Sequence, residues 1–277
     1  MVKTWVDVIQ KEGVTRLTDR WPLVFLNEQE SDRDISDNAK SITGIDGVIP
    51  GTNVYAPFEK TFQFAIYARD SYDAKIIFRE MRELLQVREP FFIRYEREPG
   101  HRFAVNRVKI EPPEFTKGSF KQGVINMTCN VYKGYAESLG TTMNPITFNQ
   151  EIWAIGNKLL VYDDLIYTHT SKEFQIYNAS SDKIDPRMRH QLDITIRCQG
   201  KPTLVNKTTG DIFVYSGVSL QMEDSLLISG VYPYRNSFHC GKDTNHGVIT
   251  LAKGWNEFHV LGTSKHIISF DFPFLYR

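Results

Sequence analysis

Two histidines and one cysteine near the C-terminus are the sequence's nearest approach to a metal-binding cluster. His239 and Cys240 are adjacent, and His246 follows six residues later. Imidazole and thiolate are ligands that zinc accepts, but this spacing fits none of the usual zinc sites and lies across a turn. We therefore predict ordinary loop residues here, and no metal site.

Two pairs of carboxylates have the residue types needed for acid–base catalysis. Asp163 and Asp164 are adjacent, and Glu111 and Glu114 are three residues apart. Glycoside hydrolysis needs two carboxylates that face each other across a cleft, whereas paired acids are also common on solvated loops. The sequence contains no nucleophile-elbow, dinucleotide, P-loop or HExxH motif. We predict no catalytic residue, no cofactor and no enzyme, with a wall hydrolase as a minor alternative.

Three aromatic residues in the second half of the chain have side chains suited to binding a partner. Tyr232, Tyr234 and Trp255 could stack on sugar rings, but a β-sandwich core or a subunit interface also needs aromatic side chains. Core or interface is the favoured reading. We take Tyr232 and Tyr234 as candidate partner contacts, and a carbohydrate-binding adhesion module as the alternative function.

The first half of the chain reads as strands around one helix. Residues 62–67 alternate apolar and polar side chains, the period of a half-buried strand, and further strands are predicted at 91–95, 102–110 and 124–132. A helix at about 71–87 can be capped by Asp70 or Ser71 and is ended by Pro90. Its apolar residues recur every three or four positions: Ala74, Ile77, Phe78, Met81, Leu84 and Leu85.

A long polar, glycine-rich stretch covers residues 27–57. A loop of this length is uncommon in a compact domain unless it has a function. Two readings remain open: a solvated loop, or an arm that orders against a neighbouring subunit.

The second half contains many short predicted strands and no convincing helix. The strands are separated by turn-forming residues about every ten positions, which is typical of a β-sandwich. The small, turn-forming segment 138–145 has no periodicity and marks the domain boundary. We predict a mainly β protein with one principal α-helix: a β-rich α+β domain at 1–140, a linker at 141–150 and a β-sandwich at 151–277. The predicted strands of this half are 173–177, 192–198, 203–206, 211–215, 225–231, 248–252, 255–261 and 266–272.

Charge and composition exclude several classes of protein. The 33 basic and 33 acidic residues balance, so no basic field attracts nucleic acid, and self-association is permitted. The three widely spaced cysteines indicate neither a disulfide framework nor a zinc site, and fit synthesis in a reducing cytoplasm. We expect no signal peptide and no membrane span.

Short motifs in a consistent order resemble those of the siphophage distal tail protein family. The likeness covers nearly the whole chain, and the order and spacing of the motifs together make it specific. The motifs are Ile45-Asp46-Gly47-Val48-Ile49-Pro50-Gly51, the 62–67 strand, the helix ending Glu83-Leu84-Leu85, residues 89–93, 123–127, Phe174–Asn178, Leu204–Gly210, Lys253–Asn256 and 268–272.

The resemblance implies a structural virion protein at the tip of a phage tail, made in the host bacterial cytoplasm. Its first domain would form a ring, with six copies around a central channel, and its second domain would be a galectin-like sandwich. The ring would join the major tail tube protein to a tail-associated hub or lysin protein and carry receptor-binding proteins. Residues 45–50, in the long polar segment, are then the candidate subunit interface. The second half lacks the polar residues with which galectins bind sugar, so the likeness implies a fold only.

Overall fold

The structure is a computed structural model that describes residues 4–115, 121–145 and 165–277. The chain forms two compact units, residues 1–137 with Arg277 and residues 138–276. It is mainly β, and α2 (Ser71–Leu85) is the principal helix of the described residues. The predicted fold class, mainly β with one principal helix, is confirmed. Of the predicted linker at 141–150, residues 146–150 lie outside the described part of the chain.

The first unit is built on one large sheet. Its strands follow the order β2-β1-β7-β8-β10-β6-β3, with β9 beside β10, and a four-residue helix, α1, lies between β2 and β3. The bounds are β1 (Val6–Gln10), β2 (Gly13–Arg16), α1 (Leu17–Arg20), β3 (Leu23–Glu30), β6 (Phe58–Tyr67), β7 (Phe91–Tyr95), β8 (His101–Ile110), β9 (Glu114–Phe115) and β10 (Gln122–Ser138).

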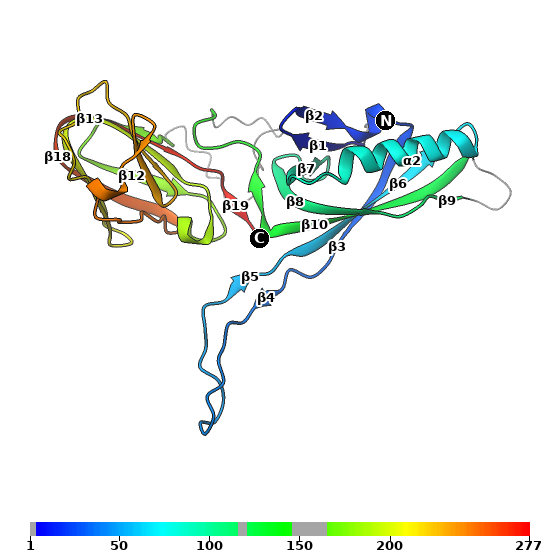
Figure 1. Ribbon diagram of the computed structural model, residues 1–277, viewed down its shortest axis with the longest axis horizontal. Coiled ribbons are helices and arrows are strands. Elements are labelled where there is room, and N and C mark those ends of the chain that lie inside the picture. Colours follow the sequence, from blue (N-terminus) through cyan, green and yellow to red (C-terminus); the bar gives the residue numbers. More distant parts are fainter. Residues whose placement is uncertain (1–3, 116–120, 146–164) are drawn as a thin grey trace. The chain divides into compact units, whose positions relative to one another are not determined.

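The helix α2 forms where its cap and apolar stripe predict it. The Asp70 carboxylate accepts hydrogen bonds from the backbone N–H groups of Tyr72 and Asp73, both at 2.9 Å, which satisfies two otherwise unpaired helix donors. The helix ends at Leu85, two residues before the predicted end. Its buried stripe consists of Ala74, Ile77, Met81 and Leu85. Burial of this stripe holds α2 on the sheet. Figure 1 shows the helix running along the sheet of the first unit.

Aromatic rings fill the core of the first unit. Tyr95 of β7 packs edge-on against Phe62 of β6 and Phe25 of β3, with centroids 5.4 and 6.1 Å apart. These residues are all buried. Because the rings come from the middle and the edge of the sheet, this cluster fixes the positions of β3 and β6, from which the long polar segment leaves.

The long polar segment is a two-stranded ribbon, not a solvated coil. Residues 27–30, which the sequence assigns to this segment, belong to β3 because they pair with β6. The remaining residues, 31–57, contain β4 (Ile35–Ser36) and β5 (Val54–Tyr55), which pair antiparallel. We call residues 31–57 the arm. Figure 1 shows it extending from the ends of β3 and β6.

The second unit is a set of strands organised by two long ones. β13 (Asp193–Asn206) and β18 (Gly254–Asp271) pair along nearly their whole length. The shorter strands of this sheet are β11 (Thr168–His169), β12 (Glu173–Asn178), β14 (Asp211–Val214), β15 (Leu226–Ser229), β16 (Tyr232–Arg235) and β17 (Phe238–His239). β19 (Leu275–Tyr276) lies outside this sheet. Two 3-10 turns complete the unit, η1 (Pro186–Met188) and η2 (Gly241–Asp243).

The two long strands fold over so that their halves face each other. The rings of Phe258 and Phe270, both in β18, lie 4.9 Å apart, although twelve residues of straight strand would separate them by roughly 40 Å. The strand must therefore bend between them. The β13–β18 register shifts on both sides of Gly200, whose partner is Thr263, next to Gly262, and both glycines have positive φ angles. These bulges bend the pair and give the second unit its two facing layers.

In the second half, two pairs of predicted strands prove to be continuous, and one predicted strand, 248–252, is wrong. The single bent strand β13 contains both predicted strands 192–198 and 203–206, and β18 contains both 255–261 and 266–272. The intervening glycines bulge the ladder without ending it. Residues 248–252 form no strand, although Leu251 makes an isolated bridge with Ile184. This segment is instead held by side chains, as described next.

Three asparagines, all fully buried, tie the segment around Leu251 to the strands. Asn178 donates to the Leu251 carbonyl, and Asn206 donates to the Thr250 carbonyl. Asn256 accepts from the Ala252 N–H and donates to the carbonyls of Ala252 and Gly254, at 2.8 to 3.1 Å. Each asparagine thus replaces the ladder partners that a non-strand segment lacks.

Candidate assembly surfaces

The arm keeps its shape through backbone pairing along its length. Beyond β4 and β5, the Asn38 side chain donates to the Thr52 carbonyl at 2.7 Å. Lys40 and Ile49 then exchange two backbone hydrogen bonds, at 3.0 and 2.9 Å. The ribbon is therefore paired almost to its turn, which lies between Lys40 and Ile49.

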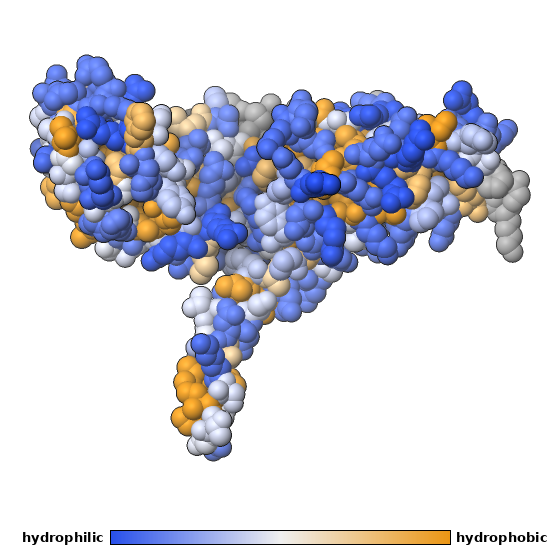
Figure 2. Space-filling view, in the orientation of Figure 1, coloured by the Kyte–Doolittle hydropathy of each residue, from blue (hydrophilic) through white to orange (hydrophobic). Residues whose placement is uncertain are grey.

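All six candidate interface residues, Ile45 to Pro50, are exposed at this turn. The side chains of Ile45 and Val48 are 63% and 60% exposed, and Ile42 and Ile49 are also exposed. Gly47 has a φ of +82°, the left-handed region that favours glycine, so the Asp46-Gly47 pair turns the chain. Figure 2 shows the hydrophobic residues gathered near the end of the arm.

The side chains of this apolar tip are not buried within their own unit. Four branched aliphatic side chains remain in water, and Asp46 is the only charged residue from Ser41 to Pro50. A grouped apolar surface of this kind marks a site of protein contact. Its chemistry is burial and backbone pairing, because it contains no catalytic group.

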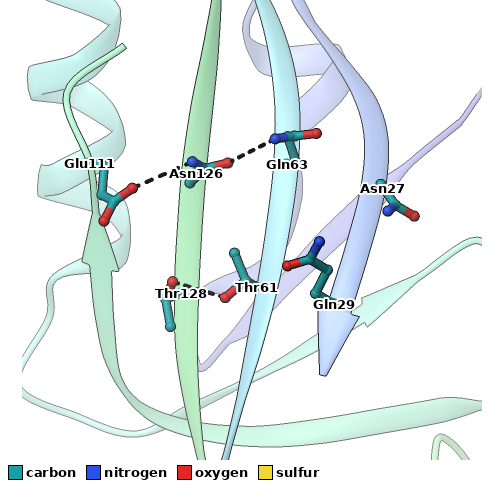
Figure 3. Close-up of a pocket in the computed structure, with 7 residues that line it drawn as sticks. All are labelled: Asn27, Gln29, Thr61, Gln63, Glu111, Asn126 and Thr128. Carbon is teal, nitrogen blue, oxygen red and sulfur yellow. Dashed lines mark hydrogen bonds between the residues drawn. The ribbon is translucent and has the colours of Figure 1, made fainter. Parts of the chain in front are cut away.

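A second surface is the polar face of the sheet formed by β3, β6 and β10 (Figure 3). Amide and hydroxyl side chains pair across the strands: Thr61 with Thr128 at 3.0 Å, and Gln63 with Asn126 at 3.3 Å. A shallow pocket on this face is lined by Asn27, Gln29, Thr61, Gln63, Glu111, Asn126 and Thr128. We call these seven residues the polar ladder.

The polar ladder has no catalytic constellation. Its single ionisable group is Glu111, which binds Lys109 at 3.1 Å and accepts from Asn126 at 3.4 Å. These hydrogen bonds, with Lys109 first, hold the pKa of Glu111 below its usual range, so the carboxylate stays ionised. A lone ionised carboxylate can accept hydrogen bonds but cannot serve as a proton donor. Its predicted companion, Glu114, lies in β9 and does not line the pocket.

A third surface is the aromatic hairpin of β16 and β17 in the second unit. Tyr232 is 58% exposed, and Tyr234 is half-buried. Their rings approach His239 at centroid distances of 6.3 and 5.7 Å, with interplanar angles of 59° and 84°. The two tyrosine rings are therefore inclined to the imidazole ring of His239 and do not stack on it.

The sequence reading missed the most exposed ring of this hairpin, Phe238. Its side chain is 79% exposed, next to the turn formed by Asn236 and Ser237. Both turn residues have positive φ, as a tight two-residue hairpin turn requires. The Asn-Ser pair between aromatic residues was the available signal, but Pro233 argued against a strand.

Among the residues that the structure describes, the remaining candidate chemical groups do not form a site. His239 and His246 are exposed while Cys240 is buried, and no group of three metal-binding side chains occurs within residues 4–115, 121–145 and 165–277. Asp163 and Asp164 lie outside the described residues. His266 is buried, and its ring forms hydrogen bonds with the Thr263 hydroxyl and the Ser171 carbonyl. No helix in the described part of the chain is long and apolar enough to cross a bilayer.

Comparison with known proteins gives a family match and a fold match. Residues 16–129 match the family model of the phage tail protein RIFT-related domain. Curated protein sequences give no significant match. The solved structures include the Dit protein of phage SPP1, described as a paradigm of the hub adsorption apparatus in phages that infect Gram-positive bacteria. It is 12% identical, with a TM-score of 0.63, over 98% of this chain and 99% of that one. A chain of the phage P2 baseplate, in its activated conformation with Ca, is 12% identical, with a TM-score of 0.44, over 99% and 98%.

The two matches are consistent with each other, although they cover different lengths of the chain. The family model spans most of the first unit, which carries the arm and the polar ladder. The SPP1 Dit likeness extends the same fold through the second unit. Residues 16–129 thus match a phage tail protein domain, and the chain as a whole shares the fold of the SPP1 Dit protein.

Proposed function

We propose that this protein forms a ring, of six copies by family resemblance, that joins the tail tube to the tail-tip or baseplate hub. The observation that carries the proposal is the arm, a paired ribbon whose apolar tip is exposed in the single chain. Its occupant would be the adjacent copy, since a heterologous contact repeated by rotation closes a ring. The ring domain would comprise residues 1–140. Its axial partners would be the major tail tube protein and a tail-associated hub or lysin protein.

Within such a ring, the first units would line the central channel. The polar ladder supports this role because its amide and hydroxyl groups are well hydrated and none of its residues is cationic. A lining without cations would not hold phosphate groups by counterion release. The protein would thus act at the tail tip of the virion after synthesis in the bacterial cytoplasm, without recognising nucleic acid.

Deleting Asp32–Asn53 is expected to leave a folded monomer. The deletion removes the apolar tip but spares β3, β6 and the aromatic core. Light scattering over a concentration series would give a mass near six times 32.0 kDa for the full chain and near one chain for the variant. Circular dichroism would check that the strands remain. An assembly of equal mass without the arm would contradict the proposal.

We further propose that the second unit, a galectin-like sandwich at 151–277, carries receptor-binding proteins through the aromatic hairpin. Exposed Tyr232 and Phe238 are the kind of side chain that anchors protein interfaces. The alternative is a carbohydrate-binding module, in which an exposed ring would stack on a sugar.

Replacing Tyr232 and Phe238 by alanine is expected to weaken binding of the phage's receptor-binding protein by about thirty-fold or more, the effect of losing an interface anchor. Surface plasmon resonance with the two purified proteins would measure this loss. Trp255→Ala, which removes another exposed ring of the second unit, is the matched control and should bind normally. Equal loss in both variants, or none in either, would argue against this surface.

A further inference from the structure

The arm leaves the first unit beside a buried cation. Lys60 of β6 is only 2% exposed, and its ammonium group pairs with Glu30 of β3 at 2.8 Å. Glu30 and Lys60 form the last cross-strand pair before the arm begins. One residue further on, Ser31 donates its N–H to the Glu59 carbonyl at 2.8 Å, and the Ser31 hydroxyl accepts from the Glu59 N–H at 2.9 Å.

Lys60 connects the root of the arm to the core of the unit. Its ammonium group lies over the rings of Tyr95 and Phe103, 4.8 and 4.5 Å from their centroids. Burial raises the pKa of the nearby Glu98, but the hydrogen bond from His101 and the charge of Lys60 outweigh it and lower that pKa to about 2. Lys60 therefore interacts with groups in β3, in β7, in β8 and in the turn between the last two.

The same ion pair continues into the arm. Glu30 also binds the guanidinium of Arg33, a residue of the arm. That guanidinium lies over the ring of Phe58, at the start of β6, 4.7 Å from its centroid. Lys60, Glu30, Arg33 and Phe58 thus form a continuous set of contacts across both strands at the root of the arm. We call these four residues the root clamp.

Stability alone does not account for a buried ammonium at this place. Burying an ion pair costs desolvation that its attraction often fails to recover, and replacing both partners by apolar residues of similar size is commonly neutral. What a buried pair does supply is a single geometry for the groups that bind it. At this position, the geometry that it sets is the direction in which the arm leaves the sheet.

We propose that Lys60 is a positioning residue that holds the arm in its binding direction, so that little ordering is required when the tip docks on a second copy of this chain. The inference rests on the proposed ring, in which the arm contacts the adjacent subunit. An arm free to swing would lose conformational freedom on docking, and the assembly would weaken accordingly.

Lys60→Met tests this role because methionine keeps the length and apolar contacts of the side chain but not the charge. Because the variant removes one partner of a buried pair, we expect a lower melting temperature in a protein that still folds at 25 °C. We also expect an assembly midpoint at about ten-fold higher concentration, the cost of ordering one mobile segment. Lys11→Met is the matched control, because Lys11 forms an exposed ion pair with Glu89 away from the arm. It should change neither value.

A distance measurement reports the arm directly. The three native cysteines are buried, so spin labels can be attached selectively at Ser41→Cys in the arm and Lys75→Cys on α2. Electron paramagnetic resonance on dilute protein should give a narrow distance distribution in the original chain and a broad one with Lys60→Met. If that variant fails to fold, Arg33→Met breaks the clamp on its exposed side and should broaden the distribution in the same way.

The outcomes separate this inference from the proposed ring. Unchanged assembly and an unchanged narrow distribution in a folded clamp variant would overturn the positioning role, even if deletion of the arm abolishes assembly. If instead the full chain never assembles, the proposed ring fails while the distance distributions still decide whether Lys60 positions the arm. A broad distribution in the unsubstituted chain would also overturn the inference.

Discussion

Asn256→Asp is expected to lower the free energy of unfolding of the second unit by about 4 kcal/mol or more at neutral pH, since it strands buried polar groups and buries a charge. Asn256 is fully buried and donates to two carbonyl groups, those of Ala252 and Gly254. Aspartate fills the same volume and can still accept from the Ala252 N–H. It would, however, set a carboxylate against both carbonyl oxygens.

The effect of Asn256→Asp should depend on pH with a defined sign. The buried site disfavours the charged form, so the pKa of the introduced carboxyl is raised in the folded state above its ordinary value of about 3.9. The variant is then least impaired below pH 4 and loses stability as the pH rises toward the raised pKa. Urea denaturation at pH 4 and pH 7 measures this difference.

Asn245→Asp is the matched control. Asn245 also bridges backbone groups, accepting from the Val214 N–H and donating to the Ile212 carbonyl, but it is exposed. Water can solvate the new carboxylate there, so we expect a loss below about 1 kcal/mol. Equal losses in the two variants would mean that burial of Asn256 contributes nothing, and would refute the argument.

The buried asparagines explain why asparagine occurs in three motifs of the second half. Asn178 and Asn256 each close a motif, and Asn206 lies within a third. Sequence alone could recognise these motifs but not their role, because the carbonyl groups that Asn178 and Asn206 bind belong to a distant part of the chain around Leu251. The three asparagines are therefore features of the fold.

Local signals predicted the elements whose causes are local. The helix α2 was predictable because Asp70 caps it and its apolar stripe repeats within the same fifteen residues. The bends of β13 and β18 were not, because Gly200 and Gly262 resemble turn residues until their strands are seen to pair across them. In a sequence, a glycine that ends a strand cannot be distinguished from a glycine that forms a bulge within a strand.

The candidate surfaces were predictable in the same uneven way. Residues 45–50 were identified from their motif, and their exposure agrees with a role at an interface, which itself stays a prediction. The pairing that turns the arm into a ribbon was not readable, because Asn38 and Thr52 lie fourteen residues apart in a polar stretch. The root clamp was equally hidden, since one lysine in an alternating strand does not reveal that it is buried.

Gly262→Ala is expected to cost the second unit about 3–5 kcal/mol, combining backbone strain with a steric collision. The residue has a φ of +75°, where an L side chain is strained, and an added Cβ would overlap the Lys201 carbonyl oxygen. Gly210→Ala separates the two causes. Gly210 has a similar φ of +79°, but nothing lies within 4 Å of its added Cβ, so only about 1–2 kcal/mol of strain is expected.

The difference between these two glycine variants measures how closely the bent strands approach each other. Thermal and urea denaturation of both proteins would measure the two losses of unfolding free energy. Similar losses would mean that the strands move apart readily at the bend, and that the bend does not require glycine at position 262. The mass of the assembled protein is a second measurement on the same variants. The arm and its root clamp belong to the first unit, whereas Gly262 belongs to the second. A protein destabilised by Gly262→Ala should therefore still reach the mass of the ring, because the contacts that we propose to close it are untouched.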